Sequence, residues 1–213
     1  MKNNALNKIC LSLSDKNAIP ISKNLEKYKD FIFEIRIDLF DKINKTIQKI
    51  LKSDNKIIIT CRGKNCTNKK KLLWAKSSKN ILAIDIEFNA QSLKNDIKYF
   101  SNYPLILSYH NYNETPNFQV LSDLFEKMQS LNPDFVKIVT YDKNKDYKNL
   151  QKLYNNANKI NLIAFTLGCS SLESRVCALQ KGAPFVFASP SKDNAVFPGQ
   201  PYYEDILNKY YGK

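Results

Sequence analysis

Eight short apolar runs recur along this chain at nearly constant spacing. They begin at Ile9, Ile32, Lys56, Ile81, Leu105, Phe135, Asn161 and Phe185. The intervals between these starts are 23, 24, 25, 24, 30, 26 and 24 residues. Stretches with apolar residues at helical spacing lie between several of the runs, at 41–53, 89–102, 117–131 and 147–158. Strands that alternate with helices predict βα units and a parallel sheet.

The number and length of these units favour a closed barrel. Eight units of roughly 25 residues are what a (β/α)8 barrel requires, although about 250 residues is its commoner size. An open doubly wound sheet usually has a Gly-rich phosphate turn after its first strand, and "LSLSDKNAIP" (11–20) contains no glycine. No Pro/Gly-rich linker divides the chain. We therefore expect an α/β fold, a (β/α)8 TIM barrel, in a single domain over residues 1–213.

Polar side chains interrupt the predicted strands in a consistent way. A parallel strand that is covered on both faces is normally almost entirely apolar. In "FIFEIRIDLF" (31–40), however, Glu34, Arg36 and Asp38 stand two residues apart and should share a face. Other polar positions in the strands are Ser12, Arg62, Asp85, Glu87, Ser108, His110 and Lys137. Each alone could be a structural ion pair or a solvated side chain, but most lie near the carboxyl ends of strands, where barrels build their active sites.

Lys137 is the most reactive candidate among these residues. It stands between apolar neighbours in "DFVKIVT" (134–140), and the loss of hydration near inward arginines would favour its neutral amine. Such an amine can attack a carbonyl group and form a Schiff base. That chemistry needs a group that exchanges protons near neutral pH, and His110 is the only histidine in the chain. Arg36, Arg62 and Arg175 would suit an anionic, hydroxylated substrate.

The formal net charge of +13 raises the question of nucleic acid. The lysines are scattered, with one local block at 64–71, so a solvated surface is favoured over a specific nucleic-acid site. No apolar stretch approaches the ~18 residues needed to cross a bilayer. Without a signal-peptide core at the N-terminus, we expect a cytoplasmic protein with no membrane partner. The five cysteines agree with this compartment, and no metal-ligand spacing is present.

Seven segments in chain order resemble the motifs of type I 3-dehydroquinate dehydratases, the Schiff-base dehydratases of the shikimate pathway. The segments are "EIRIDLF" (34–40), "ITCR" (59–62), "IDIE" (84–87), "SYHNYNETP" (108–116), "VKIVT" (136–140), "SLESR" (171–175) and "FPGQ" (197–200). Any one of them is a weak signal. Seven in order, on predicted barrel strands and their loops, are specific.

The resemblance implies a lyase of aromatic amino-acid biosynthesis that converts 3-dehydroquinate to 3-dehydroshikimate in one catalytic barrel, with no metal or organic cofactor. Lys137 would form an imine with the substrate ketone, and His110 would act as general acid and base. Arg175 would pair with the substrate carboxylate. Further substrate contacts would come from Ser12, Glu34, Arg36, Arg62 and Gln200. Family members are often dimers, which implies a homodimer.

Two positions depart from the family pattern. Many members have a glutamate near the catalytic histidine, four residues after the arginine of the third strand, and here that residue is Cys66. Many also have a serine four residues before the final glutamine, and here that residue is Val196. Loss of the carboxylate would lower the pKa of His110. The lysine, the histidine and the arginines are retained, so we expect an active enzyme.

Two other functions stay open at this point. Another Schiff-base barrel lyase, of the aldolase type, would keep Lys137 but would need a phosphate site, and "GCSSLESR" (168–175) is not Gly-rich. An inactive basic barrel that acts as a binding protein would have little reason to retain Lys137, His110 and the arginines. Salt-sensitive binding of nucleic acid without dehydratase activity would support it.

Overall fold

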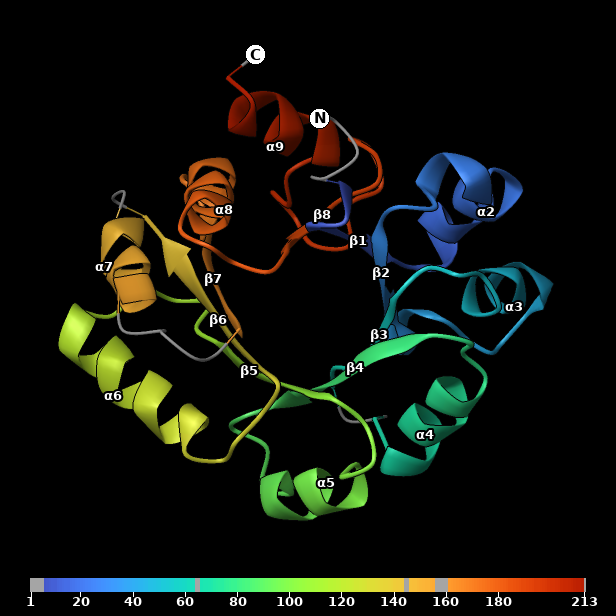
Figure 1. Cartoon of the computed structure of the whole chain (residues 1–213), viewed down its shortest axis with the longest axis horizontal. Coiled ribbons are helices and arrows are strands. Elements are labelled where there is room, and N and C mark those ends of the chain that lie inside the picture. Colours follow the sequence, from blue (N-terminus) through green and yellow to red (C-terminus); the bar gives the residue numbers. More distant parts are fainter. Residues whose placement is uncertain (1–5, 64–65, 144–145, 156–160, 213) are drawn as a thin grey trace.

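The computed structural model describes residues 6–63, 66–143, 146–155 and 161–212. In this part of the chain, eight parallel strands form a nearly closed barrel that is surrounded by helices (Figure 1). The strands are β1 (Ile9–Leu13), β2 (Ile32–Arg36), β3 (Ile57–Thr60), β4 (Ile81–Glu87), β5 (Leu105–His110), β6 (Phe135–Asp142), β7 (Asn161–Gly168) and β8 (Val186–Ala188). Six begin where the spacing predicts, and β3 and β8 begin one residue later. The predicted barrel is confirmed.

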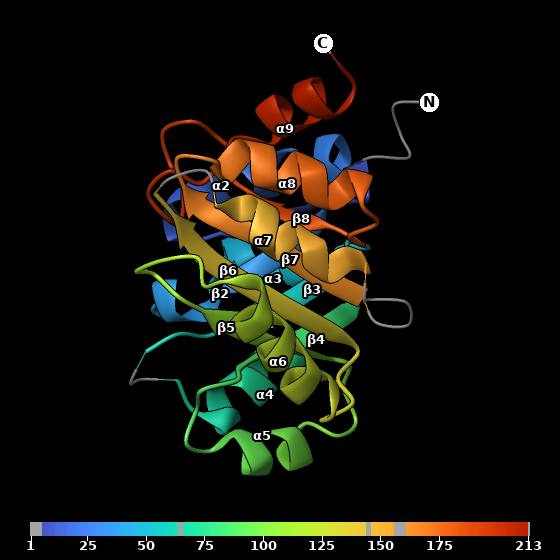
Figure 2. The same ribbon diagram turned by 90° about the vertical axis from the view of Figure 1, so that its left-hand side faces the viewer.

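A helix follows each strand. The α-helices are α2 (Asp15–Lys23), α3 (Lys45–Leu51), α4 (Asn68–Lys76), α5 (Leu93–Tyr99), α6 (Phe118–Gln129), α7 (Tyr147–Gln151), α8 (Ser171–Gln180) and α9 (Tyr203–Tyr210), and the 3-10 helices are η1 (Leu25–Tyr28), η2 (Ile37–Leu39) and η3 (Lys152–Asn155). Figure 2 shows α6, α7 and α8 on the outside of the strands. Of the helix predicted at 147–158, residues 156–158 lie outside the described residues. None of the helices in the described ranges could cross a membrane.

The strand order leaves one seam in the barrel. It runs β7-β6-β5-β4-β3-β2-β1-β8, so the first strand pairs with both the second and the last. Within the described residues, β7 and β8 form no ladder with each other. The last strand has only 3 residues, which limits the pairing it can make. The β7–β8 seam therefore needs contacts other than a β-ladder.

Side-chain caps fix where α3 and α6 begin, and apolar spacing sets the buried face of α6. Asn44 and Asn117 accept hydrogen bonds from backbone N–H groups in the first turns of α3 and α6. Such capping satisfies donors that have no partner inside the helix, and it explains why α3 begins later than the stretch at 41–53 predicts. Leu121, Phe125 and Met128 are buried along α6, four and three residues apart, which places them on one face.

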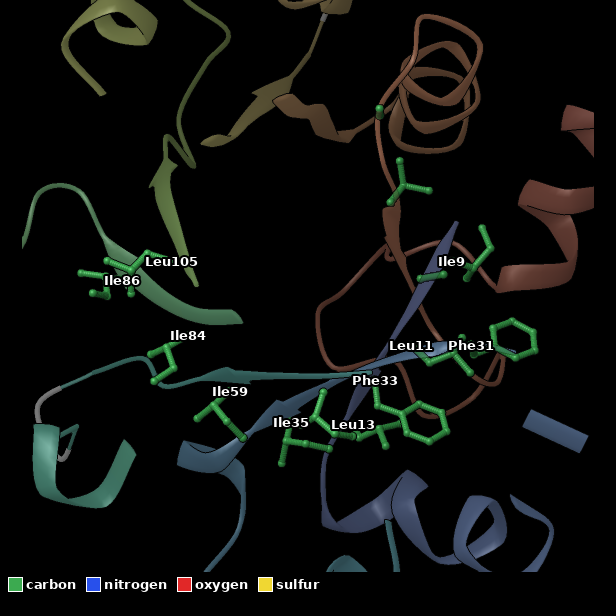
Figure 3. Packing of buried hydrophobic residues seen from close by; sticks show 14 of the residues in the cluster. Ile9, Leu11, Leu13, Phe31, Phe33, Ile35, Ile59, Ile84, Ile86 and Leu105 are labelled. Carbon is green, nitrogen blue, oxygen red and sulfur yellow. The ribbon is translucent and has the colours of Figure 1, made fainter. Parts of the chain in front are cut away.

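Alternate strand positions build two apolar cores. The outer core lies between strands and helices and includes Leu11, Leu13, Phe33 and Ile35 (Figure 3). A second cluster, from the opposite faces of the strands, includes Cys10, Ile32, Ile58, Ala83, Ile106, Phe135, Ile163 and Phe185. Successive residues of a strand point to opposite faces, so this second set points into the barrel. Further along the same inward faces the residues become polar.

The end of β2 corrects one prediction. Glu34 and Arg36 belong to the strand, but the strand stops at Arg36 and Asp38 lies in η2. The predicted common face therefore holds for the first two residues only. Asp38 still contacts Arg36, since its carboxylate accepts hydrogen bonds from Nε at 3.0 Å and from Nη2 at 2.6 Å.

Phe33 provides a test of the outer core. Its side chain is fully buried, so Phe33→Ala should lower the free energy of unfolding by about 3–5 kcal/mol, through lost burial and the cavity left behind. Chemical denaturation followed by circular dichroism measures this. Val120→Ala is the control, because Val120 is 51% exposed and should change stability by no more than about 0.5 kcal/mol. Equal effects of the two changes would contradict the described packing.

Candidate active site

All eight residues that the sequence nominates line one pocket. They are Ser12, Glu34, Arg36, Arg62, His110, Lys137, Arg175 and Gln200. The pocket has a volume of about 270 Å³, which suits one small molecule better than a polymer. Its strand residues follow the apolar inward positions, so it lies toward the carboxyl ends of the strands, as expected for a barrel active site.

Lys137 lies deep in this pocket, near two carboxylates. Its Nζ is 3.3 Å from Oδ2 of Asp85 and 3.9 Å from Oε1 of Glu34. The same Nζ lies 3.8 Å from the centre of the Phe187 ring. The sequence predicted that arginines would surround the Lys137 amine. This prediction is wrong, because the charged groups nearest to the amine are carboxylates. The side chain is nevertheless only 6% exposed, so the amine is largely removed from water.

Asp85 connects Lys137 to Arg62. Its Oδ1 is 2.8 Å from Nη2 of Arg62 and accepts a hydrogen bond from the Ser108 hydroxyl at 2.7 Å. Burial opposes ionisation, but the positive charges of Arg62 and Lys137 outweigh it and hold the pKa of Asp85 well below its ordinary value. Asp85 is fully buried, and its charge is shared between two cations on neighbouring parts of the site.

His110 is held by Glu87. The Nδ1 atom of His110 lies 2.8 Å from Oε2 of Glu87, which also lies 3.6 Å from Nη1 of Arg62. Burial lowers the pKa of His110; the hydrogen bond to Glu87 acts in the opposite direction, and the charges of Arg62 and Lys137 lower it further. The contact at Nδ1 leaves Nε2 as the ring nitrogen that can exchange protons with a ligand.

The carboxylate partner of His110 corrects the interpretation of Cys66. The sequence predicted that a cysteine at this position would leave the histidine without a carboxylate. In the structure Glu87, at the end of β4, supplies that carboxylate. Cys66 instead forms a disulfide with Cys61. The pKa of His110 is lowered, but by burial and not by the loss of a carboxylate, so the predicted cause is wrong.

Arg175 spans the seam of the barrel. It projects from α8, and its Nε donates to the Phe187 carbonyl of β8 at 2.8 Å, while Nη1 donates to the Thr166 carbonyl of β7 at 3.0 Å. The guanidinium also lies 4.0 Å from the centre of the Phe165 ring. These bonds join two strands that share no ladder, so Arg175 closes the barrel as well as lining the pocket.

Arg175 is also a buried cation, and the described part of the chain provides no counter-ion for it. The residue is 1% exposed, and no carboxylate within the described ranges forms an ion pair with it. Burial lowers its pKa to about 9, which still leaves the guanidinium charged at neutral pH. An unpaired buried charge is costly. A carboxylate ligand in the pocket would supply the missing partner.

A second cluster of polar side chains lies beside Lys137. The Ser12 hydroxyl donates to Oε2 of Glu34 at 2.6 Å, and Nε2 of Gln200 donates to that hydroxyl at 3.0 Å. Two buried oxygens that belong to pocket-lining residues have no hydrogen bond to any described residue: Oγ1 of Thr60 and Oε1 of Gln200. Hydroxyl groups of a ligand could satisfy them.

Several residues of the site lie outside the set predicted from the sequence. Asp85 and Glu87 were recognised as inward charges, but their roles as partners of Lys137 and His110 were not predicted. Thr60 was missed, although it stands two residues before Arg62 and therefore shares its inward direction. The signal was present in the two-residue periodicity. The apolar wall formed by Leu39, Tyr112, Val139, Leu167 and Phe197 carried no comparable signal, and Val196 beside them was recognised only as a departure from the family pattern.

The position of Asp85 predicts its effect on stability. Asp85→Asn would leave Arg62 and Lys137 without their shared buried anion and should lower the free energy of unfolding by about 3–5 kcal/mol. Asp54→Asn is a matched control, because its ion pair with Lys79 lies at the surface and should contribute no more than about 1 kcal/mol. Chemical denaturation measures both. An Asp85 variant as stable as the control would contradict the described network.

Comparison with known proteins agrees with this geometry. The model of the Type I 3-dehydroquinase family matches residues 9–212. The 3-dehydroquinate dehydratase of Pyrococcus abyssi is 31% identical over 201 residues, covering 87% of this chain and 90% of the relative. That of Methanococcus maripaludis strain S2 is 31% identical over 210 residues, covering 90% and 93%.

Solved structures show the same fold. The type I 3-dehydroquinate dehydratase of Clostridium difficile superposes with a TM-score of 0.74 at 22% identity, covering 96% of this chain and 91% of that one. The 3-dehydroquinate dehydratase of Geobacillus kaustophilus gives a TM-score of 0.76 at 18% identity, covering 95% and 89%. With the family match over nearly its whole length, this chain belongs to the type I 3-dehydroquinase family.

Proposed function

We propose that this chain converts 3-dehydroquinate to 3-dehydroshikimate and water through an imine on Lys137, with His110 as general acid and base. Membership of the family supports the overall reaction. One observation carries the assignment of residues: the Lys137 amine and the uncompensated Arg175 guanidinium line the same pocket. We further propose that residues 1–213 form one catalytic domain, with the reaction taking place in the barrel.

The substrate offers groups that match both ends of the pocket. 3-Dehydroquinate is a six-membered ring with a carboxylate, a ketone and several hydroxyl groups. Its carboxylate would pair with Arg175, the buried cation to which the described residues supply no anion. Its hydroxyl groups would bind the remaining polar residues of the pocket, which are Ser12, Glu34, Arg36, Arg62 and Gln200. This binding would fix the ketone near Lys137.

Imine formation would begin with attack of the neutral Lys137 amine on the ketone carbon. The carbinolamine would then lose the former ketone oxygen as water, with protons supplied and accepted by His110. The product is a protonated imine, a cation inside the barrel. Asp85 at 3.3 Å and Glu34 at 3.9 Å from Nζ are placed to stabilise that charge. The low pKa of Asp85 keeps it anionic throughout.

The elimination step would follow from the acidity of the carbon next to the imine. A proton leaves this carbon, and the electron pair moves into the imine to give an enamine. Return of that pair expels the hydroxyl group beside the carboxylate, which leaves as water after protonation. Water then hydrolyses the imine and regenerates the Lys137 amine. His110 stands on the strand next to that of Lys137, and Glu87 would hold its ring for these transfers.

Assembly and location are further parts of this proposal. We propose that the enzyme is located in the cytoplasm, where its substrate would be made and its product consumed. We also propose that it forms homodimers, as the family resemblance implies. The positive net charge of +13 would favour anionic substrates over neutral ones.

Two substitutions test the catalytic roles. Lys137→Met should reduce kcat on the order of 10⁴-fold or more, because no other group forms the imine. His110→Ala should reduce kcat by about 10²–10⁴-fold, the usual contribution of a proton-transfer group. Formation of the conjugated product, followed by its ultraviolet absorbance, measures both. Lys127→Met is the control for the lysine change, since Lys127 is exposed on α6 and should leave turnover unchanged. Normal turnover by either active-site variant would contradict its role.

A third substitution tests the positioning of His110. In Glu87→Gln the negative charge that raises the histidine's pKa is lost, so the pKa of His110 should fall further. The acidic limb of the kcat profile, where His110 gains a proton, should therefore move to lower pH. The maximum rate should also fall by about 10–100-fold. Glu114→Gln makes the same charge change at an exposed position that shares no hydrogen bond or ion pair with His110 and should shift nothing. An unchanged acidic limb in Glu87→Gln would rule out this pairing in solution.

A further inference from the structure

A disulfide joins the end of the third strand to the loop that follows it. Cys61 and Cys66 are five residues apart in sequence, and their Cα atoms are 5.6 Å apart, within the usual span for this bond. The other three cysteines are free: Cys10 is buried, Cys169 is exposed and Cys177 is partly buried. The crosslink thus involves one particular pair among the five cysteines.

The crosslink lies directly on the backbone of Arg62. Cys61 is the residue before Arg62, and the sulfur of Cys66 lies 2.9 Å from the Arg62 carbonyl oxygen. The guanidinium of Arg62 in turn contacts Asp85 at 2.8 Å and Glu87 at 3.6 Å. These are the carboxylates that hold Lys137 and His110. A covalent constraint at this point therefore acts on the residue that connects both halves of the site.

The two cysteine residues differ in their exposure to solvent. Cys61 is 5% exposed and belongs to the outer core, whereas Cys66 is only partly buried. A thiol reductant could therefore approach Cys66 with less disturbance of the barrel. Access and the choice of attacked sulfur govern thiol–disulfide exchange. Outside oxidising compartments, disulfides are commonly transient or redox-sensing.

We propose that Cys61 and Cys66 form a reversible regulatory disulfide, a modification site that controls catalysis by fixing Arg62. A dithiol reductant would attack Cys66, release the Cys61 thiolate and form a mixed disulfide. The second thiol of the reductant would then displace Cys66. One disulfide is broken and one is made, and two electrons and two protons pass to the enzyme. A disulfide oxidant reverses the change. This proposal rests on the proposed function.

Reduction of the Cys61–Cys66 disulfide should lower the catalytic efficiency of the enzyme. Without the crosslink, Cys66 no longer constrains the backbone next to Arg62, and the guanidinium of Arg62 is held less closely against Asp85 and Glu87. A displacement of about 1 Å in a positioning group can cost on the order of 100-fold in rate. We therefore expect kcat/KM to be at least about tenfold lower in the reduced enzyme.

The test equilibrates the whole chain in glutathione buffers from fully reducing to fully oxidising. Each sample is divided. One half is denatured, alkylated and analysed by peptide mass, which should show the Cys61–Cys66 crosslink with three alkylated cysteines, or five when reduced. The other half is assayed, and kcat/KM should fall as the crosslink disappears.

Variants identify the sulfurs responsible. Cys66→Ser and Cys61→Ala should each show the low kcat/KM of the reduced enzyme in every buffer. The double variant Cys169→Ser/Cys177→Ser should keep the full redox response. The proposal is overturned if the crosslink forms in no buffer, or if crosslinked and reduced enzyme have equal kcat/KM. Absence of dehydratase activity in both states would instead overturn the proposed function, and this proposal with it.

Discussion

The rest of the site depends on the ion pairs made by the fully buried carboxylate of Asp85. It lies between Arg62 and Lys137, two cations that would otherwise repel each other inside the barrel. Through Arg62 the same network reaches Glu87 and so fixes His110. A single buried anion thus holds an amine and an imidazole on neighbouring strands, which is the arrangement that imine chemistry with proton transfer requires.

A second constraint is the open seam between β7 and β8. The guanidinium of Arg175 replaces the missing ladder by donating to a carbonyl of each strand. Its charge remains unbalanced among the described residues, so closure of the barrel and recognition of an anion depend on the same side chain. Binding of a carboxylate there would remove the cost of a lone buried charge. The fold and the proposed substrate are linked at this residue.

Much of the fold follows from the spacing of apolar runs, because each βα unit must return the chain to the same end of the barrel. Six of the eight nominated pocket residues were also predictable, since strand geometry points polar residues two apart to one face, whereas the roles of Arg175 on α8 and Gln200 in the last loop rested on the family resemblance. The side chains with which these residues pair were not predictable. Whether His110 meets Glu87 or the loop at Cys66 depends on side-chain reach, and the Cys61–Cys66 bond depends on the loop path. Sequence spacing carries neither kind of information.

The most direct measurement is chemical trapping of the imine. The protein is incubated with 3-dehydroquinate and treated with borohydride, which reduces the carbon–nitrogen double bond to a stable amine, and its peptides are then analysed by mass. A substrate-derived mass on the peptide that contains Lys137, and on no other lysine, is the predicted result. Turnover without any adduct, or with an adduct on a different lysine, would contradict the central claim that Lys137 carries the reaction.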